Sequence, residues 1–316
     1  MSNFSLSQIT NHKSIRDGFG EVLLELGEQN PDVVVLSADL SGSTRAKKFA
    51  EKYPERFIEC GVAEQNMMGI AAGLALSGKT PFVTSFAVFS PGRNWEQLRV
   101  SVCYSQANVK IASTHAGLLT GADGATHQAL EDIALTRVLP NLVVLSPADF
   151  YQAKKATRAA AEYKGPVYIR LTRDKTTIFT KEKETFEIGK AEVLRRGRDL
   201  TLIGTGPIVY EALQAAEKLR DKARIEVINL PTIKPLDKMA ILASVEKTGK
   251  VATVEDHQVF GGIGSAVAEF LGEELPVPVI KIGMPDIFGE SGKGRELWEK
   301  YGLTAEGIVR RLEKVI

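Results

Sequence analysis

Residues 59–78, ECGVAEQNMMGIAAGLALSG, place one carboxylate at the start of an apolar run. Every residue from Met67 to Leu76 is Met, Gly, Ile, Ala or Leu, and a helix that is apolar all round is expected to be buried. Glu64 would open that helix. A carboxylate in dry surroundings is costly unless it is paired or protonated, and proteins keep such groups where an unusual protonation state is useful. Glu64 is therefore a candidate proton-transfer residue; the alternative is a surface glutamate stabilised by the helix dipole.

The segment THAGLLTGADGATHQ, residues 114–128, carries two of the four histidines of the chain. His115 and His127 stand on either side of Asp123, and glycines flank that aspartate. A metal site is the weaker interpretation, because no third histidine or cysteine lies nearby. Imidazoles that hydrogen-bond the hydroxyl groups of a substrate, or that transfer protons, fit this pattern better.

Two aromatic residues, Phe86 and Phe89, follow the apolar run at residues 80–85. They would either pack in the core or form a slot for a flat ring, because offset aromatic contacts are favourable. The runs GTGP (204–207) and GGIGSA (261–266) do not complete the dinucleotide-binding pattern in a first strand–helix unit. We interpret them as tight turns at helix starts.

The candidate residues follow the ends of short β-rich runs that alternate with helical patterns. These runs are continuously apolar, which is typical of parallel strands covered on both faces. Ligands of open α/β sheets bind at the carboxyl ends of the strands, so the candidates are expected to meet at one edge. The strands are predicted at residues 32–38, 56–60, 80–85, 109–114, 142–147 and 167–172. The helices between them are predicted at residues 15–30, 44–53, 64–77, 93–105, 128–138 and 149–163.

The alternation indicates two domains: a doubly wound parallel-sheet α/β domain followed by a smaller α/β domain. Residues 1–175 would form the first, residues 191–316 the second, and the charged residues 176–190 a linker. The helices of the second domain are predicted at residues 208–221, 237–246 and 263–273, with a final amphipathic helix capped by Thr304.

Composition limits the partners and the compartment. The net charge of +1 argues against nucleic acid or an anionic membrane as a partner. The two cysteines, Cys60 and Cys103, form no CxxC motif, which fits a reducing compartment. The polar run MSNFSLSQITNHKS lacks a signal core, and no apolar run approaches the roughly 20 residues that span a bilayer. The chain is therefore expected to be cytoplasmic.

Several segments together resemble the thiamine-diphosphate enzymes of the transketolase family, and the resemblance covers nearly the whole chain. They are SADLSGST, GVAEQNMMGIAAGLALSG, TSFAVFS, THAGLLTGADGATHQALEDIALTRVLPNLVVLSPAD, VEDHQVFGGIGSAVAEFL and VPVIKIGMPDIF. Full enzymes of that family have a diphosphate-binding domain with a Gly-Asp-Gly metal motif, a pyrimidine-binding domain and a C-terminal domain. This chain contains no Gly-Asp-Gly. The resemblance implies the last two domains of a split transketolase, with Mg²⁺ or Ca²⁺ held by a separate N-terminal subunit that carries the motif.

The resemblance implies that Glu64 contacts the pyrimidine ring nitrogen of thiamine diphosphate and shares its proton, which favours the reactive tautomer. Phe86 and Phe89 would stack on that ring. A further aromatic residue of the family is replaced by Gly92 here, and whether Trp95 fills the gap is left open.

Other roles are implied by the same resemblance. Leu40 matches a leucine that packs against the cofactor, and Asp39 matches an acid close to it. Asp123 and His127 match the pair that binds donor hydroxyls near the reacting carbon, so His127 joins Glu64 as a catalytic residue. Four residues would hold the substrate phosphate: His115, Ser43, Arg16 and Arg173.

The implied reaction transfers a two-carbon ketol unit from a ketose phosphate to an aldose phosphate. Active sites of the family form between domains of different subunits, so an α₂β₂ assembly around a dimer of this chain is expected.

Three alternatives remain. One is the β subunit of a 2-oxo acid dehydrogenase first component, against which GADGATHQALED argues. The second is a fragment similar to 1-deoxyxylulose-5-phosphate synthase. The third is a non-catalytic structural or regulatory subunit, against which the presence of Glu64, Asp123 and His127 argues.

Overall fold

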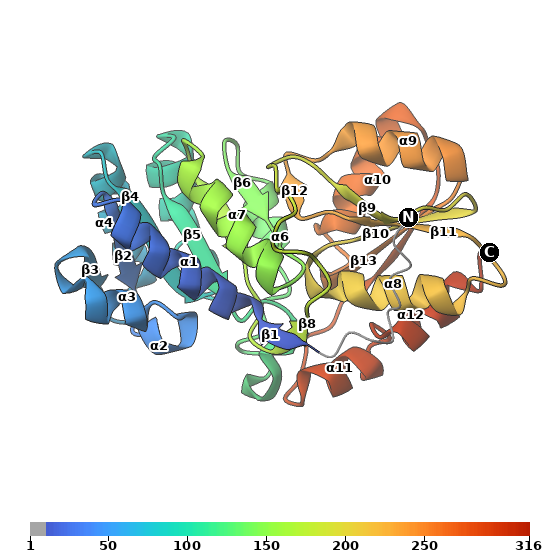
Figure 1. Cartoon of the computed structure of the whole chain (residues 1–316), viewed down its shortest axis with the longest axis horizontal. Coiled ribbons are helices and arrows are strands. Elements are labelled where there is room, and N and C mark those ends of the chain that lie inside the picture. Colours follow the sequence, from blue (N-terminus) through green and yellow to red (C-terminus); the bar gives the residue numbers. More distant parts are fainter. Residues whose placement is uncertain (1–10) are drawn as a thin grey trace.

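The computed structural model describes residues 11–316, so the first ten residues of the predicted first domain lie outside the described range. Across residues 11–316 the chain forms a pair of α/β units that lie side by side, and each is a sheet with helices on both faces (Figure 1). We call them the first unit and the second unit.

The sheet of the first unit has seven strands in the order β12-β6-β7-β5-β4-β2-β3. Its parallel strands are β2 (Val33–Ser37), β3 (Phe57–Glu59), β4 (Thr80–Phe86), β5 (Lys110–Thr114), β6 (Val143–Leu145) and β7 (Val167–Arg170). The predicted doubly wound parallel sheet is therefore confirmed. The seventh strand, β12 (Thr232–Lys234), comes from the second half of the chain and pairs antiparallel to β6, which the sequence pattern did not indicate.

Helices cover both faces of this sheet because its strands send alternate side chains into two cores. Along β2, Val33 and Val35 join one core, whereas Val34 and Leu36 join the other. The first core is covered by α1 (Ile15–Gln29), α3 (Lys47–Lys52) and α7 (Phe150–Glu162). The second is covered by α4 (Glu64–Leu76), α5 (Trp95–Gln97) with its π-helical continuation (Leu98–Tyr104), and α6 (Asp132–Arg137).

Two predicted helices are shorter in the structure, and in each case the backbone next to the helix explains the difference. The helix predicted at residues 44–53 is reduced to α3, because Arg45, left-handed with φ of 71°, ends the short helix α2 (Ser41–Thr44) before it. The helix predicted at residues 128–138 is reduced to α6. Ala129 cannot join it, because this residue forms an isolated bridge with the loop that follows β5.

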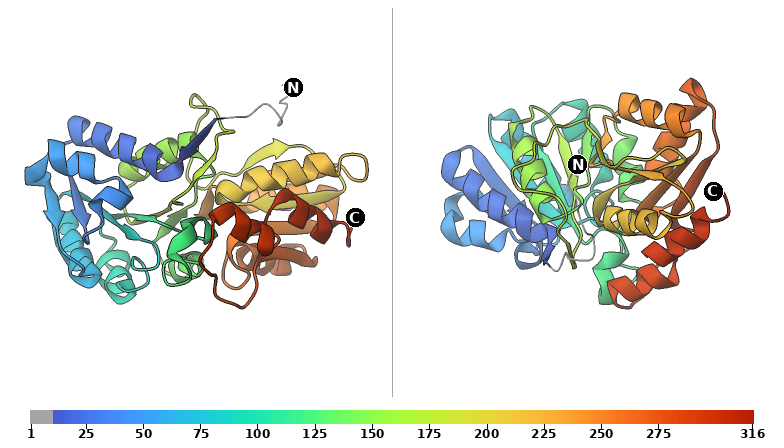
Figure 2. Two further views of the ribbon diagram at one scale, coloured as in Figure 1. Left: turned by 90° about the horizontal axis from the view of Figure 1, so that it is seen from below. Right: turned by 45° about the vertical axis from the view of Figure 1, so that its right-hand side comes forward.

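The sheet of the second unit has five strands in the order β14-β13-β10-β11-β9, with β9 antiparallel. They are β9 (Glu192–Arg195), β10 (Leu200–Gly204), β11 (Ile225–Asn229), β13 (Val251–Gln258) and β14 (Val279–Met284). One face carries α8 (Val209–Lys218) and α12 (Ala305–Leu312), and the other carries α9 (Lys238–Thr248) and α10 (Ile263–Glu274). Figure 2 shows α11 (Gly294–Lys300) on the same side as α8 and α12.

The segment predicted as a linker at residues 176–190 begins as part of the first unit. The short strand β8 (Lys175–Thr177) pairs antiparallel with β1 (His12–Ser14). The buried carboxylate of Asp149 then accepts hydrogen bonds from the amides of Phe179 and Thr180 at 2.8 and 2.6 Å. These contacts fasten the start of the segment to the helix that Asp149 caps.

The helix predicted to be buried all round is covered on one face only. Met67 and Met68 of α4 are buried, but Gly69, Gly73 and Leu76 are exposed, with Leu76 at 68%. The expectation of full burial is therefore wrong for this chain by itself. We call the exposed residues Gly69, Gly73 and Leu76 the apolar face of α4; Figure 1 shows this helix at the end of the molecule far from the second unit.

The final helix begins where it was predicted, but its cap differs. Thr304 is at the N-cap position, and its side chain makes no capping bond. Instead, the Ala305 amide donates to Oε2 of Glu211 at 2.8 Å. Among residues 11–316, no helix combines the length and apolarity that crossing a membrane requires.

Candidate active site

Segments that follow parallel strands bring the predicted residues to one edge of the first sheet. Glu64 starts α4 shortly after β3, and Phe86 is the last residue of β4. His115 follows β5 directly, and Arg173 comes soon after β7. Because the carboxyl ends of parallel strands share an edge, the topology alone gathers these residues.

Glu64 is a buried carboxylate at this edge, with 1% of its side chain exposed. Its Oε2 accepts a hydrogen bond from Nη1 of Arg93 at 2.7 Å, and the Arg93 side chain is 46% exposed. The side-chain amide of Asn94 donates to the Glu64 carbonyl at 3.3 Å, which ties the start of α4 to the segment after β4. Glu64 is thus buried, as its apolar neighbours predict, and its partner is a cation that the sequence reasoning did not select.

Phe86 and Phe89 belong to a cluster of four rings. Their centroids are 6.0 Å apart and their planes differ by 15°. The imidazole of His115 stacks on Phe86 with centroids 3.6 Å apart, and His127 meets both phenylalanines edge-on at 6.1 and 5.5 Å. The guanidinium carbon of Arg93 lies 4.7 Å from the centroid of Phe89. Phe89 therefore adjoins both the long histidine loop and the cation on the buried glutamate.

At Gly92, where the family has an aromatic residue, there is no room for a side chain. The side chain of the next residue, Arg93, lies over the ring of Phe89. A Cβ on Gly92 would lie 2.2 Å from the carbonyl oxygen of Val88, so no side chain fits there without a shift of the backbone. The indole of Trp95 is turned elsewhere, because its Nε1 donates to the carbonyl of Leu135 at 2.7 Å. Trp95 therefore does not line the slot, and Arg93 does.

His115 is buried and uncharged at neutral pH. Burial, followed by the charges of Arg16 and Arg173, lowers the pKa of its imidazole to about 3. Its Nδ1 lies 2.8 Å from the hydroxyl of Thr114. An imidazole in this state can form a hydrogen bond but adds no positive charge to a phosphate site.

The two arginines and the serine that the resemblance assigns to a substrate phosphate lie near one another. Nη1 of Arg16 donates to the carbonyl of Ser43 at 2.7 Å, and within residues 11–316 its buried Nε has no partner. Burial and the charge of Arg45 lower the pKa of Arg16 to about 10, and the charge of Arg173 acts in the same direction. Guanidinium groups with an unused buried donor suit an anionic ligand.

Asp123 and His127 lie at the open end of the long loop. Asp123 accepts a hydrogen bond from Nη1 of Arg173 at 3.2 Å, and both side chains are about one-third exposed. The same Nη1 donates to the carbonyl of Thr120 at 2.7 Å. His127 is half-buried, and its Nδ1 lies 2.9 Å from the hydroxyl of Thr126. Both residues therefore reach the surface of the site.

Asp39 and Leu40 lie between the end of β2 and α2. Asp39 is exposed with φ of 59°, and its amide donates to Oε1 of Glu59 at 2.7 Å. Leu40 is half-buried, and its amide donates to the hydroxyl of Ser37 at 3.2 Å. Because α2 packs beside β4 and β5, both residues are at the sheet edge that carries the ring cluster.

Residues of the second unit contact the long loop at residues 114–128 on the side away from the ring cluster. The sequence did not predict these contacts. Asp256 of β13 accepts a hydrogen bond from the Leu118 amide at 3.0 Å, and its carboxylate would be 2.2 Å from a Cβ on Gly117. The side chain of Gln128 donates to the carbonyl of Glu290 at 2.9 Å. Burial raises the pKa of Asp256, although a nearby arginine and the Leu118 amide oppose the rise. The only signal is the run VEDHQ, which belongs to the segments that carry the family resemblance.

No described group of three or more His, Cys, Asp or Glu side chains in residues 11–316 is arranged to hold a metal ion. The site is instead a buried carboxylate, an aromatic slot and a set of arginines.

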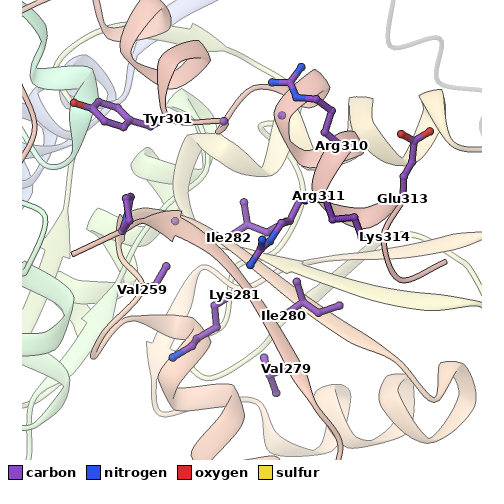
Figure 3. A pocket seen from close by; sticks show the side chains of 14 residues that line it. Val259, Val279, Ile280, Lys281, Ile282, Tyr301, Arg310, Arg311, Glu313 and Lys314 are labelled. Carbon is purple, nitrogen blue, oxygen red and sulfur yellow. The ribbon is translucent and has the colours of Figure 1, made fainter. Parts of the chain in front are cut away.

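A separate hollow of about 1000 Å³ lies in the second unit, between the edge strand β14 and α12 (Figure 3). Figure 3 shows Arg311 extending from α12 toward this strand, whereas Arg310 and Glu313 turn away. Glu313 is paired with Lys222 outside the hollow. Lys281 of β14 also lines this hollow, and cationic side chains at a free sheet edge discourage pairing with another chain.

Comparisons with known proteins agree with this arrangement. The family models described as "Transketolase, pyrimidine binding domain" and "Transketolase, C-terminal domain" match residues 11–177 and 189–308. A protein of Methanocaldococcus jannaschii named as a transketolase C-terminal section is 50% identical over 305 residues, covering 95% of this chain and 96% of that protein.

Two further similar proteins, one curated relative and one solved structure, carry different descriptions. The 6-deoxy-6-sulfo-D-fructose transketolase subunit SqwH of a Clostridium species is 43% identical over 302 residues, covering 95% of this chain and 94% of that protein. A solved structure described as "Split gene transketolase, inactive beta4 tetramer" is 46% identical with a TM-score of 0.88, and the match covers 96% of this chain and 98% of that chain.

Proposed function

This chain belongs to the transketolase family, as a C-terminal section of a split transketolase, and from that membership we propose that it catalyses ketol transfer together with a separate N-terminal subunit. The reaction moves a two-carbon ketol unit from a ketose phosphate to an aldose phosphate, as in the pentose phosphate pathway. The observation that carries the proposal is the buried carboxylate of Glu64 beside the stacked rings of Phe86 and Phe89.

The residues at this edge fit the aminopyrimidine ring of thiamine diphosphate. A planar cationic group, the guanidinium of Arg93, already contacts both the Glu64 carboxylate and the Phe89 ring, so the place suits a flat, nitrogen-bearing ring. Phe86 and Phe89 would stack on that ring, and Leu40 and Asp39 would complete its surroundings. When bound, the cofactor supplies the nucleophilic carbon that attacks the ketose and stores the electron pair.

In this proposal Glu64 holds a proton at its carboxylate and shares it with the pyrimidine nitrogen. Its burial removes competing water, so the proton stays on the pair. Asp123 and His127 bind the hydroxyl groups of the sugar next to the reacting carbon, and His127 moves protons there.

Arg16, Arg173 and Ser43 hold the phosphate of the substrate, and His115 donates a neutral hydrogen bond. This division follows from the low pKa of His115, about 3, which leaves the positive charge to the arginines. Holding the remote phosphate fixes the carbonyl in line with the cofactor.

The proposed partner supplies what this chain lacks. A Gly-Asp-Gly motif on the N-terminal subunit would hold Mg²⁺ or Ca²⁺ and the diphosphate. Self-association through the apolar face of α4 would place two copies of this chain at the centre of an α₂β₂ assembly, which would be cytoplasmic. Two observations support this: the 68% exposure of Leu76, and the description of the related solved structure as an inactive tetramer of β chains.

The isolated chain should accordingly bind thiamine diphosphate with Mg²⁺ weakly or not at all. Isothermal titration calorimetry of the purified chain tests this directly. Tight stoichiometric binding without a partner would contradict the split-enzyme proposal.

The test of the function is a pull-down of this chain from its native lysate. The eluate is assayed with Mg²⁺ and thiamine diphosphate for transfer from xylulose 5-phosphate to ribose 5-phosphate. A partner that carries Gly-Asp-Gly, together with transfer, supports the proposal. Oxidation or decarboxylation of a 2-oxo acid would favour the dehydrogenase alternative, and formation of 1-deoxyxylulose 5-phosphate would favour the synthase. A stable but inactive complex would favour a structural or regulatory subunit.

A further inference from the structure

We propose that Arg93 is the resident counter-ion of Glu64, which occupies the ring slot in the free chain and leaves it when the cofactor ring binds. The inference rests on the proposed function, because that function identifies the slot as the aminopyrimidine site. It adds a residue that neither the motifs nor the resemblance selected.

The guanidinium of Arg93 contacts both of the groups that the aminopyrimidine ring would need. Nη1 of Arg93 is 2.7 Å from Oε2 of Glu64, and the guanidinium carbon is 4.7 Å from the centroid of Phe89. The carboxylate and the aromatic face are the two groups that would hold the aminopyrimidine. A second planar group cannot lie on the same face of the Phe89 ring while the guanidinium is there, and it would also have to share the Glu64 carboxylate, so the arginine and the ring compete.

The chemistry of the two groups is similar enough for this competition. A guanidinium is planar, carries N–H donors that match a carboxylate, and stacks on aromatic faces. An aminopyrimidine that carries a proton on its ring nitrogen is also planar, donates N–H to a carboxylate and stacks. Arg93 therefore satisfies Glu64 in the free chain with the kind of contact that the ring would later make.

The side chain of Arg93 can leave while its backbone stays. Its side chain is 46% exposed, and within residues 11–316 Glu64 is its one ion-pair partner. The neighbouring Asn94 is fully buried and bonds the Glu64 carbonyl and the Ser90 hydroxyl at 3.3 and 3.1 Å. This anchor fixes the segment, so that release of Arg93 requires only rotation of its long side chain.

The pair also explains how a buried carboxylate persists in a chain without cofactor. A buried charge without a partner is strongly destabilising, whereas a paired one is tolerated. Loading of the cofactor then exchanges the arginine for the ring together with one proton taken up from solvent, which the carboxylate and the ring nitrogen share, so no bare charge is exposed.

The first experiment measures affinity for thiamine diphosphate in the reconstituted complex with its N-terminal partner and saturating Mg²⁺. Quenching of tryptophan fluorescence gives Kd for wild type, Arg93→Met and Arg93→Lys. Methionine keeps length and apolar contact but removes the competing cation, so Kd should fall about tenfold, with lysine in between. An unchanged Kd or weaker binding by Arg93→Met would overturn the proposal, because the arginine would then be neutral toward the cofactor or help to hold it.

A matched control is Arg295→Met. Arg295 Nη1 is 3.0 Å from Oε1 of Glu211, a carboxylate with 3% exposure, so this pair also joins an exposed arginine to a buried glutamate. It lies in the second unit, and its loss should leave Kd unchanged. A similar fall in Kd for Arg295→Met would show a general effect of removing positive charge and would overturn the specific role of Arg93.

The second experiment uses the isolated chain and needs no cofactor. Thermal melts of Arg93→Met, Glu64→Gln and the double variant form a cycle. Arg93→Met should lower Tm, and adding Glu64→Gln should restore most of the loss, because the amide no longer needs a counter-ion. Additive effects would overturn the pairing. A wild-type complex that binds no thiamine diphosphate in the first experiment would instead refute the proposed function, whatever the melts show.

Discussion

Glu64 in the first unit and Glu211 in the second are nearly the same feature in isolation. Each is a glutamate with at most 3% exposure, and each is paired with an arginine that reaches solvent. They differ in their other contacts: Glu211 uses its second oxygen to accept the Ala305 amide at the start of α12, so it fastens two helices. The arginine on Glu64 lies on an aromatic ring beside the histidine loop. A buried ion pair is therefore not a site in itself; the aromatic face and the loop beside it make the difference.

The largest expected effect comes from replacing each of the two glutamates, which tests whether one is catalytic and the other structural. In the reconstituted complex, Glu64→Gln should reduce kcat by about 10²–10⁴-fold, because the proton shared with the ring is lost. Glu211→Gln should leave kcat within about twofold and lower Tm instead, because it weakens a structural contact. Steady-state kinetics and thermal melts on both variants provide the measurement. An unaffected kcat in Glu64→Gln would remove its catalytic role.

The next largest effect is expected at an arginine that is assigned to the substrate phosphate, compared with an arginine of an ordinary surface ion pair. Arg16→Met should raise KM for phosphorylated substrates about tenfold or more, since it removes a charge-assisted hydrogen bond. Non-phosphorylated sugars should be affected much less. Arg158→Met is the control, because Arg158 bonds Oε2 of Glu25 on the surface at 2.6 Å. Equal rises in KM for both kinds of sugar would contradict a phosphate role for Arg16.

Each unit has a buried histidine that should make the stability of the chain depend on pH. Only the histidine of the first unit should also affect KM. Burial lowers the pKa of His115 to about 3 and that of His257 to about 4. At these two positions the folded chain resists protonation that the unfolded chain accepts near pH 6.5, so the contribution of each histidine to the free energy of unfolding falls as pH drops below that value. Each histidine contributes up to about 1.4 kcal/mol per pH unit.

Urea unfolding near pH 6.5 and near pH 5 tests this in His115→Gln and His257→Gln. Both variants should flatten the dependence on pH, whereas only His115→Gln should change KM in the complex. A pH dependence that is unchanged in either variant would contradict the assignment of a neutral, buried histidine at that position.

The smallest expected effect on folding is at the apolar face of α4. Leu76→Asp should change the free energy of unfolding by no more than about 0.5 kcal/mol, because the side chain is exposed in the single chain. It should nevertheless dissociate the self-associated form, which analytical ultracentrifugation detects. Unchanged self-association would move the interface away from α4, and a large loss of stability would mean that the face is covered within the chain.

The sequence pattern predicted the parallel sheet well because its strands are buried on both faces and so read as unbroken apolar runs. It predicted the boundaries of two helices poorly. Arg45 and Ala129 shorten these helices for reasons of backbone conformation and bridging that carry no periodic signal. Strand β12 was not foreseen, because three residues that complete a distant sheet edge have no pattern of their own.

The sequence by itself determined which residue types stand after each strand, and therefore that Glu64, the two phenylalanines and the histidine loop would share an edge. Tertiary structure alone decided their partners. Arg93 meets Glu64 across 29 positions of the chain, and Asp256 meets Leu118 across 138. Such contacts depend on how helices and units pack, not on local spacing. The same holds for the face of α4: composition makes it apolar, but only packing decides that this chain covers one side and leaves the other exposed.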